Sequence, residues 1–390
     1  MRRIAGQYLF TGKEFIKNGF VEVDDTGKVI TTGSLGNSIK EQGSTEFFNG
    51  VISPGFINTH CHIELSHMLG VVPEHKGMAA FCNTIMTSRN TVTENEQYQL
   101  MRDADKYMEK EGIVAVGDIS NGELSLEMKK NSQLYYHTFI ETLGLKPDMA
   151  ADIIAKAKRL KALFEENGLS VSITPHAPYS MSEELFKASV EEGNKSGILS
   201  IHNSESADEL EVFEKKNGAM RDVFGHYMDL FLSDYNNPAH RILKYISPDT
   251  RLLLIHNTYT TVHDIQFARK INKKTTWVLC PGSNLYIENK LPDINMLMEN
   301  DACIALGTDS LSSNKTLSIL NELKILSSAF PEIELKDMLQ WATLNGAQAL
   351  NISGKFGSFD KGKTPGILLL SNIDFKRMKI TDNSEVIRIE

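Results

Sequence analysis

From residue 51 onward, short apolar runs alternate along the chain with stretches that have helical periodicity. The runs cover residues 51–57, 112–120, 134–144, 169–178, 197–206, 251–257, 275–284 and 301–310. Each run is apolar on both faces, which is typical of parallel strands that are covered by helices. Eight such strands alternating with helices predict an α/β fold in which a (β/α)8 TIM barrel is the main body.

Two of the intervening stretches have clear helical signals. Residues 148–168 carry Ile, Ala and Leu at helical spacing and end at Gly168. Residues 180–197 are also predicted to be helical, and Ser180 and Glu183 have the spacing of a capping box at its start. An open doubly wound sheet is the alternative fold. It would call for a glycine-rich phosphate loop, and neither GxGxxG nor GxxxxGK[ST] occurs in the sequence.

The two ends of the chain differ from the middle. Residues 1–50 and 355–390 consist of short strand and turn patterns, so we predict that they form one small composite β-sandwich domain beside a barrel at 51–354. Residues 207–249 are too long for a bare loop, and we predict a helical lid there.

Composition excludes several partners and compartments. The net charge of −9 and the pI near 5.7 argue against binding to nucleic acid or to an anionic membrane, because both need a basic face. No apolar run reaches the ~18 residues of a membrane span. The four cysteines form no CxxC pair, which is typical of free thiols in a reducing compartment. We therefore expect a cytoplasmic protein, and its oligomeric state stays open, a homodimer included.

Histidines gather at the ends of the predicted strands. Five of the eleven lie at or just after the C-terminal end of an apolar run, namely His60, His62, His176, His202 and His256. In a barrel these ends form one rim, where active sites are built. Histidines of the core or the surface would have no reason to collect there.

A subset of these residues is suited to binding a metal ion. His60 and His62 are two apart, so in an extended strand both rings point to one face. His202 ends the fifth run and Asp309 ends the eighth. An HxH pair alone is weak evidence, and a lone Asp at a strand end is more often a turn residue. Three imidazoles and one carboxylate on one rim, however, suit zinc or a similar divalent ion.

Six segments in order resemble a known superfamily. They are PGFINTHCHIELS, PHAPYS, IHNSES, LIHN, CPGSNLYIENKLPDI and LGTDSLSSN, between about residues 50 and 365. Together they resemble the amidohydrolase superfamily, most closely the single-metal branch that contains cytosine, guanine, S-adenosylhomocysteine or methylthioadenosine, and aminodeoxyfutalosine deaminases. The resemblance implies one divalent metal ion, zinc in preference to iron. It also implies a small heterocyclic substrate with an amino group, a purine base or nucleoside derivative.

The resemblance assigns roles to the rim residues. It places His60, His62, His202 and Asp309 as metal ligands and Glu205 and His256 as catalytic residues. The carboxylated lysine that bridges two metals in other branches is not matched, because His176 stands at that place, and this favours one ion.

The residues themselves suggest the same chemistry. Asp309 could take the proton of a metal-activated water, His256 could hydrogen-bond the same oxygen, and Glu205 could protonate a ring nitrogen. Alone, Glu205 is equally well read as a carboxylate that stabilises a helix N-terminus.

Four further residues are predicted to contact the substrate. His176 and Asn284 are taken from the family motifs, whereas Glu64 and Arg89 lie where aminodeoxyfutalosine deaminases are most similar to this chain. A carboxylate and an arginine would suit a ribose diol and an anionic group. Arg89 is equally well read as a surface residue of a helix.

Three functions are therefore compared. The first is a metal-dependent hydrolytic deaminase. The second is a chlorohydrolase or cyclic-amide hydrolase acting on a related nitrogen ring. The third, a non-catalytic binding barrel, predicts a broken ligand set, and no ligand is missing from this sequence.

Overall fold

The computed structural model describes residues 1–36, 44–232 and 234–389. Its strands form three sheets, two of them parallel and four-stranded. The first parallel sheet contains β6 (Phe56–Cys61), β7 (Ile113–Ser120), β8 (Tyr135–Thr142) and β9 (Ser170–Pro175). The second contains β10 (Ile198–Asn203), β11 (Arg251–His256), β12 (Thr275–Leu279) and β13 (Ile304–Leu306). These eight strands lie within or beside the eight predicted apolar runs and alternate with helices, as the sequence indicates.

Hydrogen bonds join the two parallel sheets at both of their edges. The His202 amide donates to the His176 carbonyl at 3.0 Å, which links β10 to the end of β9. At the other edge, the amides of Thr308 and Asp309 both donate to the His60 carbonyl at 3.0 Å. The eight strands therefore share one direction, and their C-terminal ends lie on one side of the molecule.

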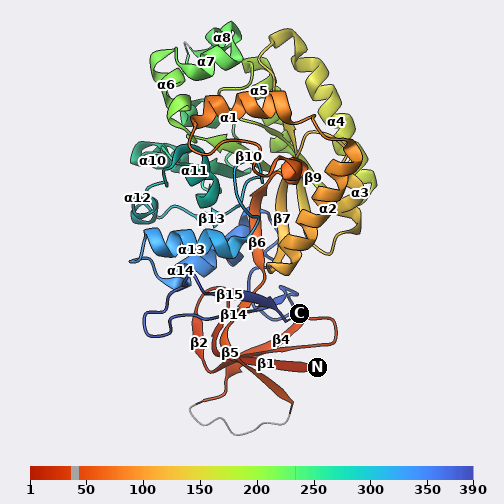
Figure 1. The fold of residues 1–390 in the computed structure, drawn as a ribbon, viewed down its shortest axis with the longest axis vertical. Coiled ribbons are helices and arrows are strands. Elements are labelled where there is room, and N and C mark those ends of the chain that lie inside the picture. Colours follow the sequence, from red (N-terminus) through yellow and green to blue (C-terminus); the bar gives the residue numbers. More distant parts are fainter. Residues whose placement is uncertain (37–43, 233, 390) are drawn as a thin grey trace.

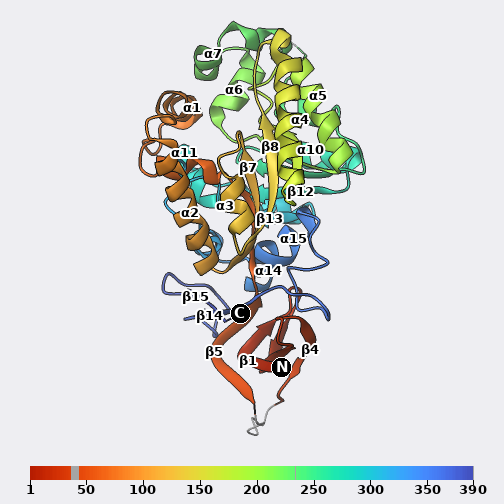
Figure 2. The ribbon, with the colours of Figure 1, turned by 90° about the vertical axis from the view of Figure 1, so that its right-hand side faces the viewer.

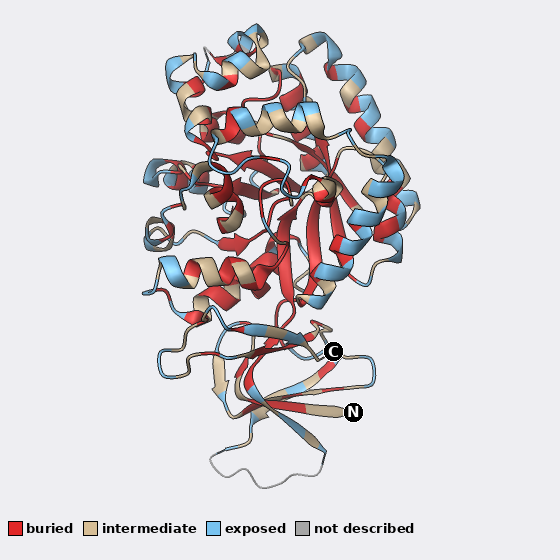
Figure 3. Cartoon of the chain, viewed as in Figure 1, coloured by how far each residue is buried: buried red, intermediate tan, exposed pale blue. Residues whose placement is uncertain are grey.

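Helices surround the parallel strands (Figures 1 and 2). The longer ones are α2 (Glu94–Lys110), α4 (Ala150–Glu166), α5 (Glu183–Ser196), α10 (Val262–Ile271) and α13 (Ile319–Ala329). Shorter ones are α3 (Leu126–Asn131), α11 (Pro281–Glu288), α12 (Ile294–Glu299), α14 (Leu335–Gln340) and α15 (Gly346–Ala349). Every residue of β7 and β10 is buried, as two-sided covering requires, and Figure 3 shows the strands as the buried centre.

The helix predicted at 180–197 begins two residues later than its capping signal suggested. The N-cap is Ser182, whose side chain accepts a hydrogen bond from the Leu185 amide. The Ser180 hydroxyl instead lies 2.7 Å from Nδ1 of His176. The capping-box prediction for Ser180 and Glu183 is therefore wrong, because Ser180 belongs to the loop that orients His176.

The predicted lid consists of short helices. Between β10 and β11 lie α6 (Ala207–Lys215), α7 (Ala219–Phe224), α8 (Asp229–Leu232) and α9 (Pro238–Leu243). Together with α1 (Gly77–Ser88), helices α6, α7 and α8 lie at the end of the molecule opposite the third sheet (Figure 1). The C-terminal strand ends therefore open beneath these helices.

The third sheet draws strands from both ends of the chain. Its order is β15-β14-β5-β1-β3-β4, with β2 paired to β1. The N-terminal strands are β1 (Arg2–Phe10), β2 (Phe15–Lys17), β3 (Gly19–Val23), β4 (Val29–Ser34) and β5 (Thr45–Pro54), and the C-terminal ones are β14 (Ile367–Ser371) and β15 (Glu385–Arg388). A β-sandwich is not confirmed, because these strands pair into one seven-stranded sheet. The run at 51–57 is also divided, since Val51–Pro54 belong to β5 and β6 begins at Phe56.

Among the described residues, no helix combines the length and the apolar character needed to cross a bilayer.

Candidate active site

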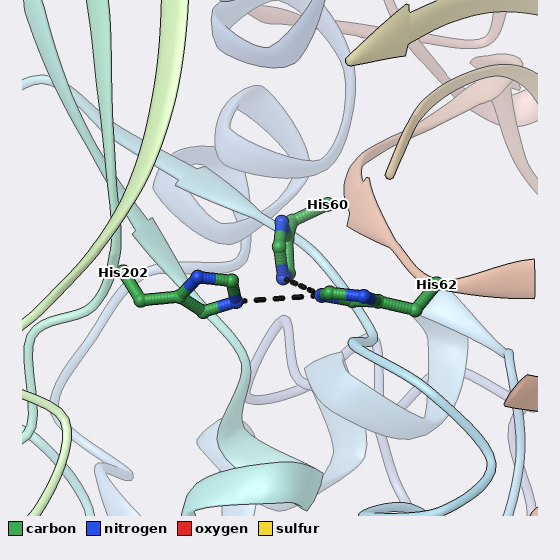
Figure 4. A group of neighbouring side chains, drawn as sticks. All are labelled: His60, His62 and His202. Carbon is green, nitrogen blue, oxygen red and sulfur yellow. Dashed lines mark hydrogen bonds between the residues drawn. The ribbon is translucent and has the colours of Figure 1, made fainter. Parts of the chain in front are cut away.

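The polar residues predicted from the strand ends meet in one cluster. Nε2 of His62 lies 3.2 Å from Nε2 of His60 and 3.3 Å from Nε2 of His202 (Figure 4). Oδ1 of Asp309 lies 3.6 Å from Nε2 of His60 and 3.5 Å from Nε2 of His62. Four side chains from β6, β10 and the end of β13 therefore point their donor atoms at one small volume.

Neighbouring groups fix the orientation of these side chains. Nδ1 of His202 lies 2.8 Å from the carbonyl oxygen of His176, so the ring presents its Nε2 to the cluster. Oδ2 of Asp309 accepts hydrogen bonds from the hydroxyls of Ser283, at 2.8 Å, and Ser313. Only Oδ1 of Asp309 therefore faces the histidines.

The backbone is strained at this site. Asp309 has φ of 58° and His256 has φ of 74°, a left-handed region that non-glycine residues seldom adopt. Such conformations cost about 1–3 kcal/mol each and persist where the surrounding structure enforces them, commonly at functional sites. In Asp309 and His256 the strain coincides with the strand ends that carry the cluster.

Gly307 allows β13 to approach His60 closely. A Cβ atom at Gly307 would lie 2.8 Å from Cβ of His60 and 2.9 Å from its backbone N and O. These separations are shorter than real Cβ contacts, and two of the atoms belong to the backbone, so a side chain here would displace His60.

We expect Gly307→Ala to reduce metal content and to lower kcat by about 10–100-fold, because small displacements of reacting groups have effects of this size. Metal analysis and turnover measurements on the purified variant check this. Gly354→Ala is the control, since nothing lies within 4 Å of the Cβ position at Gly354. Wild-type metal content and turnover in Gly307→Ala would show that the position of His60 does not require a glycine at residue 307.

Burial and neighbouring charge set the protonation of the cluster. Burial, reinforced by His60, lowers the pKa of His62 to about 4, and burial together with the neighbouring histidines puts the pKa of His202 well below its ordinary value. Burial also acts on the Asp309 carboxyl, but the surrounding histidines outweigh it and hold its pKa well below the usual range. His62 and His202 are therefore neutral imidazoles beside the ionised Asp309 carboxylate, the protonation states that metal ligands need.

The donor set fits one divalent ion. Ligand atoms that are bound to zinc at ~2.0–2.1 Å in tetrahedral geometry lie about 3.3–3.4 Å apart, close to the separations of Nε2 of His62 from Nε2 of His60 and of His202. Neutral imidazoles bring lone pairs together here, which is unfavourable without a shared cation. Within the described part of the chain, Nδ1 of His60 and both ring nitrogens of His256 also have no hydrogen-bond partner although they are buried. The cluster therefore has the chemistry of a cation site.

Glu205 lies beside the cluster rather than within it. Its Oε1 is 3.1 Å from Nε2 of His256, and both side chains are nearly fully buried. Burial, with Asp309 and Glu209 nearby, raises the pKa of Glu205 well above its ordinary value. The N-cap of α6 is the next residue, Ser206, which accepts a hydrogen bond from the Glu209 amide. Glu205 therefore lies directly before the N-cap of α6, close to that helix N-terminus, and a buried carboxyl with a raised pKa is also suited to proton transfer.

A cavity opens above the cluster. The empty space inside it, including open solvent at its mouth, is about 850 Å³. His62, His202, Glu205, His256 and Asp309 line its inner end. Apolar side chains from α1, from the loop after β9 and from α7 line much of the rest, among them Met78, Phe81, Ile85, Tyr179 and Phe224.

The four predicted substrate residues separate into two pairs. His176 and Arg89 line the cavity. Glu64 and Asn284 are not among its lining residues, because Glu64 accepts hydrogen bonds from the Asn121 amide and the Ser125 hydroxyl, and the Asn284 side-chain amide donates to Thr258. In the structure Glu64 and Asn284 are hydrogen-bonded to neighbouring residues of the site, whereas His176 and Arg89 line the cavity. Substrate contact stays a prediction for all four residues.

Glu141 and Asn121 are polar residues of the cavity wall that the sequence analysis does not single out. Glu141 lies near the C-terminal end of β8, in the same kind of position as the rim histidines. A polar residue at the end of an apolar run is therefore the sequence signal that indicates Glu141.

A buried arginine of the lid holds the loop that carries His176. The Arg241 guanidinium is fully buried and donates from Nη2 to the Met181 carbonyl at 2.8 Å and from Nη1 to the Pro178 carbonyl. Its Nε lies 3.4 Å from Oε2 of Glu183 at the start of α5. Helix α9 is thus attached to the loop between β9 and α5.

We expect Arg241→Met to lower the free energy of unfolding by about 2–4 kcal/mol, because two buried carbonyls lose their donor. Urea unfolding of both proteins measures the change. Arg159→Met, on an exposed position of α4, is the matched control. Equal stability of Arg241→Met and wild type would show that the lid does not hold this loop.

Comparisons with known proteins agree with this geometry. The family model described as Amidohydrolase family matches residues 51–387. An adenosine deaminase of Helicobacter pylori is 30% identical over 315 residues, covering 79% of this chain and 76% of that protein. The chain belongs to the amidohydrolase family. As a member with relatives named as deaminases, this amidohydrolase is a hydrolase that acts on carbon–nitrogen bonds, as predicted.

Solved structures show that the fold is shared. An aminofutalosine deaminase of Helicobacter pylori, solved in complex with methylthio-coformycin, superposes with a TM-score of 0.83 at 23% identity and covers 97% of this chain and 94% of that one. A zinc-complexed atrazine chlorohydrolase of Arthrobacter aurescens has a TM-score of 0.77 at 15% identity, with coverages of 97% and 90%. These neighbours imply a TIM-barrel fold for the amidohydrolase.

Proposed function

We propose that this amidohydrolase is a metal-dependent hydrolytic deaminase of a purine nucleoside or a close derivative. The observation that carries the proposal is the buried Glu205 carboxyl, 3.1 Å from His256 and in the same cavity as the histidine and aspartate cluster. The names of the Helicobacter pylori relatives, an adenosine deaminase and an aminofutalosine deaminase, support the substrate class.

We assign His60, His62, His202 and Asp309 as the ligands of one divalent ion. Three imidazoles and a carboxylate favour zinc, with iron as the alternative, and the zinc complex of the chlorohydrolase neighbour supports this choice. When bound, such an ion lowers the pKa of a coordinated water from ~15.7 towards ~7.

The chain's own residues divide the proton transfers between them. Oδ1 of Asp309 is the atom available to accept a proton from the attacking water, because Oδ2 is held by Ser283 and Ser313. Glu205 gives its proton to a ring nitrogen, which makes the neighbouring carbon electrophilic. A carbon–oxygen bond forms at that carbon as Asp309 accepts one water proton. Glu205, now ionised, takes the proton of the new hydroxyl group and passes it to the amine, so that the carbon–nitrogen bond breaks, ammonia departs and the carbon becomes a carbonyl. The proton held by Asp309 then restores Glu205 for the next turnover. His256, whose Nε2 lies 3.1 Å from Oε1 of Glu205, hydrogen-bonds the attacking oxygen.

The remaining cavity wall suits a flat ring with a charged or polar substituent. Phe81, Tyr179 and Phe224 offer aromatic faces, and His176 lies between them and the cluster, with its ring centroid 4.7 Å from that of His202. Arg89 is a cationic lining residue, and no carboxylate partner within 4.0 Å is recorded for its guanidinium in the described part of the chain. We propose that it binds an anionic group on the substrate.

The test is ammonia release from a panel that contains adenosine, 5′-deoxyadenosine, methylthioadenosine, adenine, guanine and a chloro-substituted triazine. We expect ammonia from at least one adenine nucleoside. Chloride release from the triazine without ammonia from any purine would instead support the chlorohydrolase alternative. Binding of purines without any turnover by the zinc-loaded protein would support the non-catalytic barrel.

We further propose that the two parallel sheets form one closed barrel, with residues 51–354 as its body and residues 1–50 and 355–390 as a composite domain. The hydrogen bonds at both sheet edges support closure, and the pairing of β14 with β5 supports the composite domain. A cytoplasmic location and a small-molecule substrate, without nucleic acid or membrane as partner, stay predictions.

A further inference from the structure

We propose that Glu141 is a specificity-determining residue that accepts hydrogen bonds from the sugar hydroxyls of a nucleoside substrate. This inference rests on the proposed function and adds the part of the substrate that the catalytic cluster does not contact. It starts from a carboxylate in the cavity wall that no step of the reaction uses.

Glu141 has hydrogen-bonding capacity to spare. Its Oε2 accepts one hydrogen bond, from the side-chain amide of Asn121 at 3.0 Å. Among the residues that the structure describes, its Oε1 has no hydrogen-bond partner, and it lies 3.9 Å from Nδ1 of the neutral His202 ring. That nitrogen already pairs with the carbonyl oxygen of His176. A carboxylate can accept about four hydrogen bonds, and a buried one that is largely unsatisfied is costly, so a ligand with O–H donors would relieve it.

The Glu141 carboxylate is held in place by a second acid. Oε2 of Glu64 accepts from the Asn121 backbone amide at 2.9 Å, and Oε1 of Glu64 accepts from the Ser125 hydroxyl at 3.1 Å. Asn121 in turn donates to Glu141. Glu64 thus positions Asn121, and Asn121 orients Glu141.

The position of Glu141 along β8 indicates which part of a nucleoside it meets. Glu141 and Leu143 are two residues apart and both line the cavity, with Leu143 exposed at its mouth. Glu141 therefore lies between the cluster and the mouth. Glu205 follows β10 and His256 ends β11, so both come from the second parallel sheet, whereas Glu141 comes from the first. With the reacting carbon of the ring at the cluster, the substituent that leads outward past Glu141 is the sugar. Its vicinal hydroxyls are neutral donors that match an acceptor-only carboxylate.

The test compares the zinc-loaded wild type with Glu141→Gln on adenosine, 2′,3′-dideoxyadenosine and adenine. In the wild type, we expect loss of the two hydroxyls to lower kcat/KM by about 10–100-fold, as removal of a donor to a charged acceptor does. In Glu141→Gln, kcat/KM for adenosine and for 2′,3′-dideoxyadenosine should differ by less than about threefold. Glu123→Gln, an exposed acid in the loop after β7, is the matched control and should behave as the wild type.

Other outcomes overturn the inference. An equal loss on all three substrates in Glu141→Gln would mean that Glu141 contacts the base or only supports the fold. Calorimetric binding of inosine and 2′,3′-dideoxyinosine separates this question from turnover. If the wild type releases no ammonia from any purine, the proposed function fails. In that case the role of Glu141 in binding the sugar hydroxyls stands only if the wild type binds inosine more tightly than 2′,3′-dideoxyinosine and Glu141→Gln binds the two equally well.

Discussion

Glu205→Gln should retain the bound metal and lower kcat by about 10²–10⁴-fold, the contribution expected of a general acid and base. Glutamine keeps the size of the side chain but cannot donate a carboxyl proton to the ring nitrogen. Because Glu205 is not among the assigned ligands, metal content should stay at the wild-type level. Steady-state ammonia release and metal analysis on the same preparation give both quantities.

Glu214→Gln is the matched control for this experiment. Glu214 is an exposed acid of α6, the helix that begins two residues after Glu205. It should have wild-type kcat and metal content. Near-normal turnover in Glu205→Gln would refute the proton-transfer role, and loss of metal in that variant would show that Glu205 is itself a ligand.

His202→Ala should lose both metal and turnover. Loss of a group that only supports a ligand typically lowers metal affinity by about 10–100-fold, so loss of the ligand itself should lower it further. The variant should also unfold at a lower temperature than the metal-loaded wild type, because an ion that binds only the folded state stabilises it. Metal analysis, activity and thermal unfolding measure these effects.

His226→Ala serves as the control, since His226 is an exposed residue of the lid, in the turn between α7 and α8. It should keep wild-type metal content and unfolding temperature. A His202→Ala protein that still holds one equivalent of metal and turns over normally would remove His202 from the ligand set.

The cluster could be predicted because its signal is local in the sequence. His60, His202, His256 and Asp309 each close an apolar run, and the barrel topology alone brings such positions to one side. Their assembly therefore needs no knowledge of side-chain packing. The spacing of His60 and His62 likewise fixes two rings on one face of a strand.

Other parts depend on tertiary contacts that no local pattern encodes. Ser180 has the spacing of a capping residue, yet its hydroxyl is beside His176 because the loop after β9 turns it inwards. Glu64 follows the HxH motif, yet the loop after β7 engages its carboxylate. The division of residues 51–57 between two sheets is set by pairing with β14, more than 300 residues away.

Dependence of turnover on one bound metal ion can be measured by metal analysis of the purified wild type, combined with ammonia release before and after exhaustive chelation. We expect about one equivalent of zinc or iron per chain, loss of turnover when the metal is removed, and recovery when one equivalent of zinc is restored. Full turnover in metal-free protein would contradict the metal-dependent mechanism.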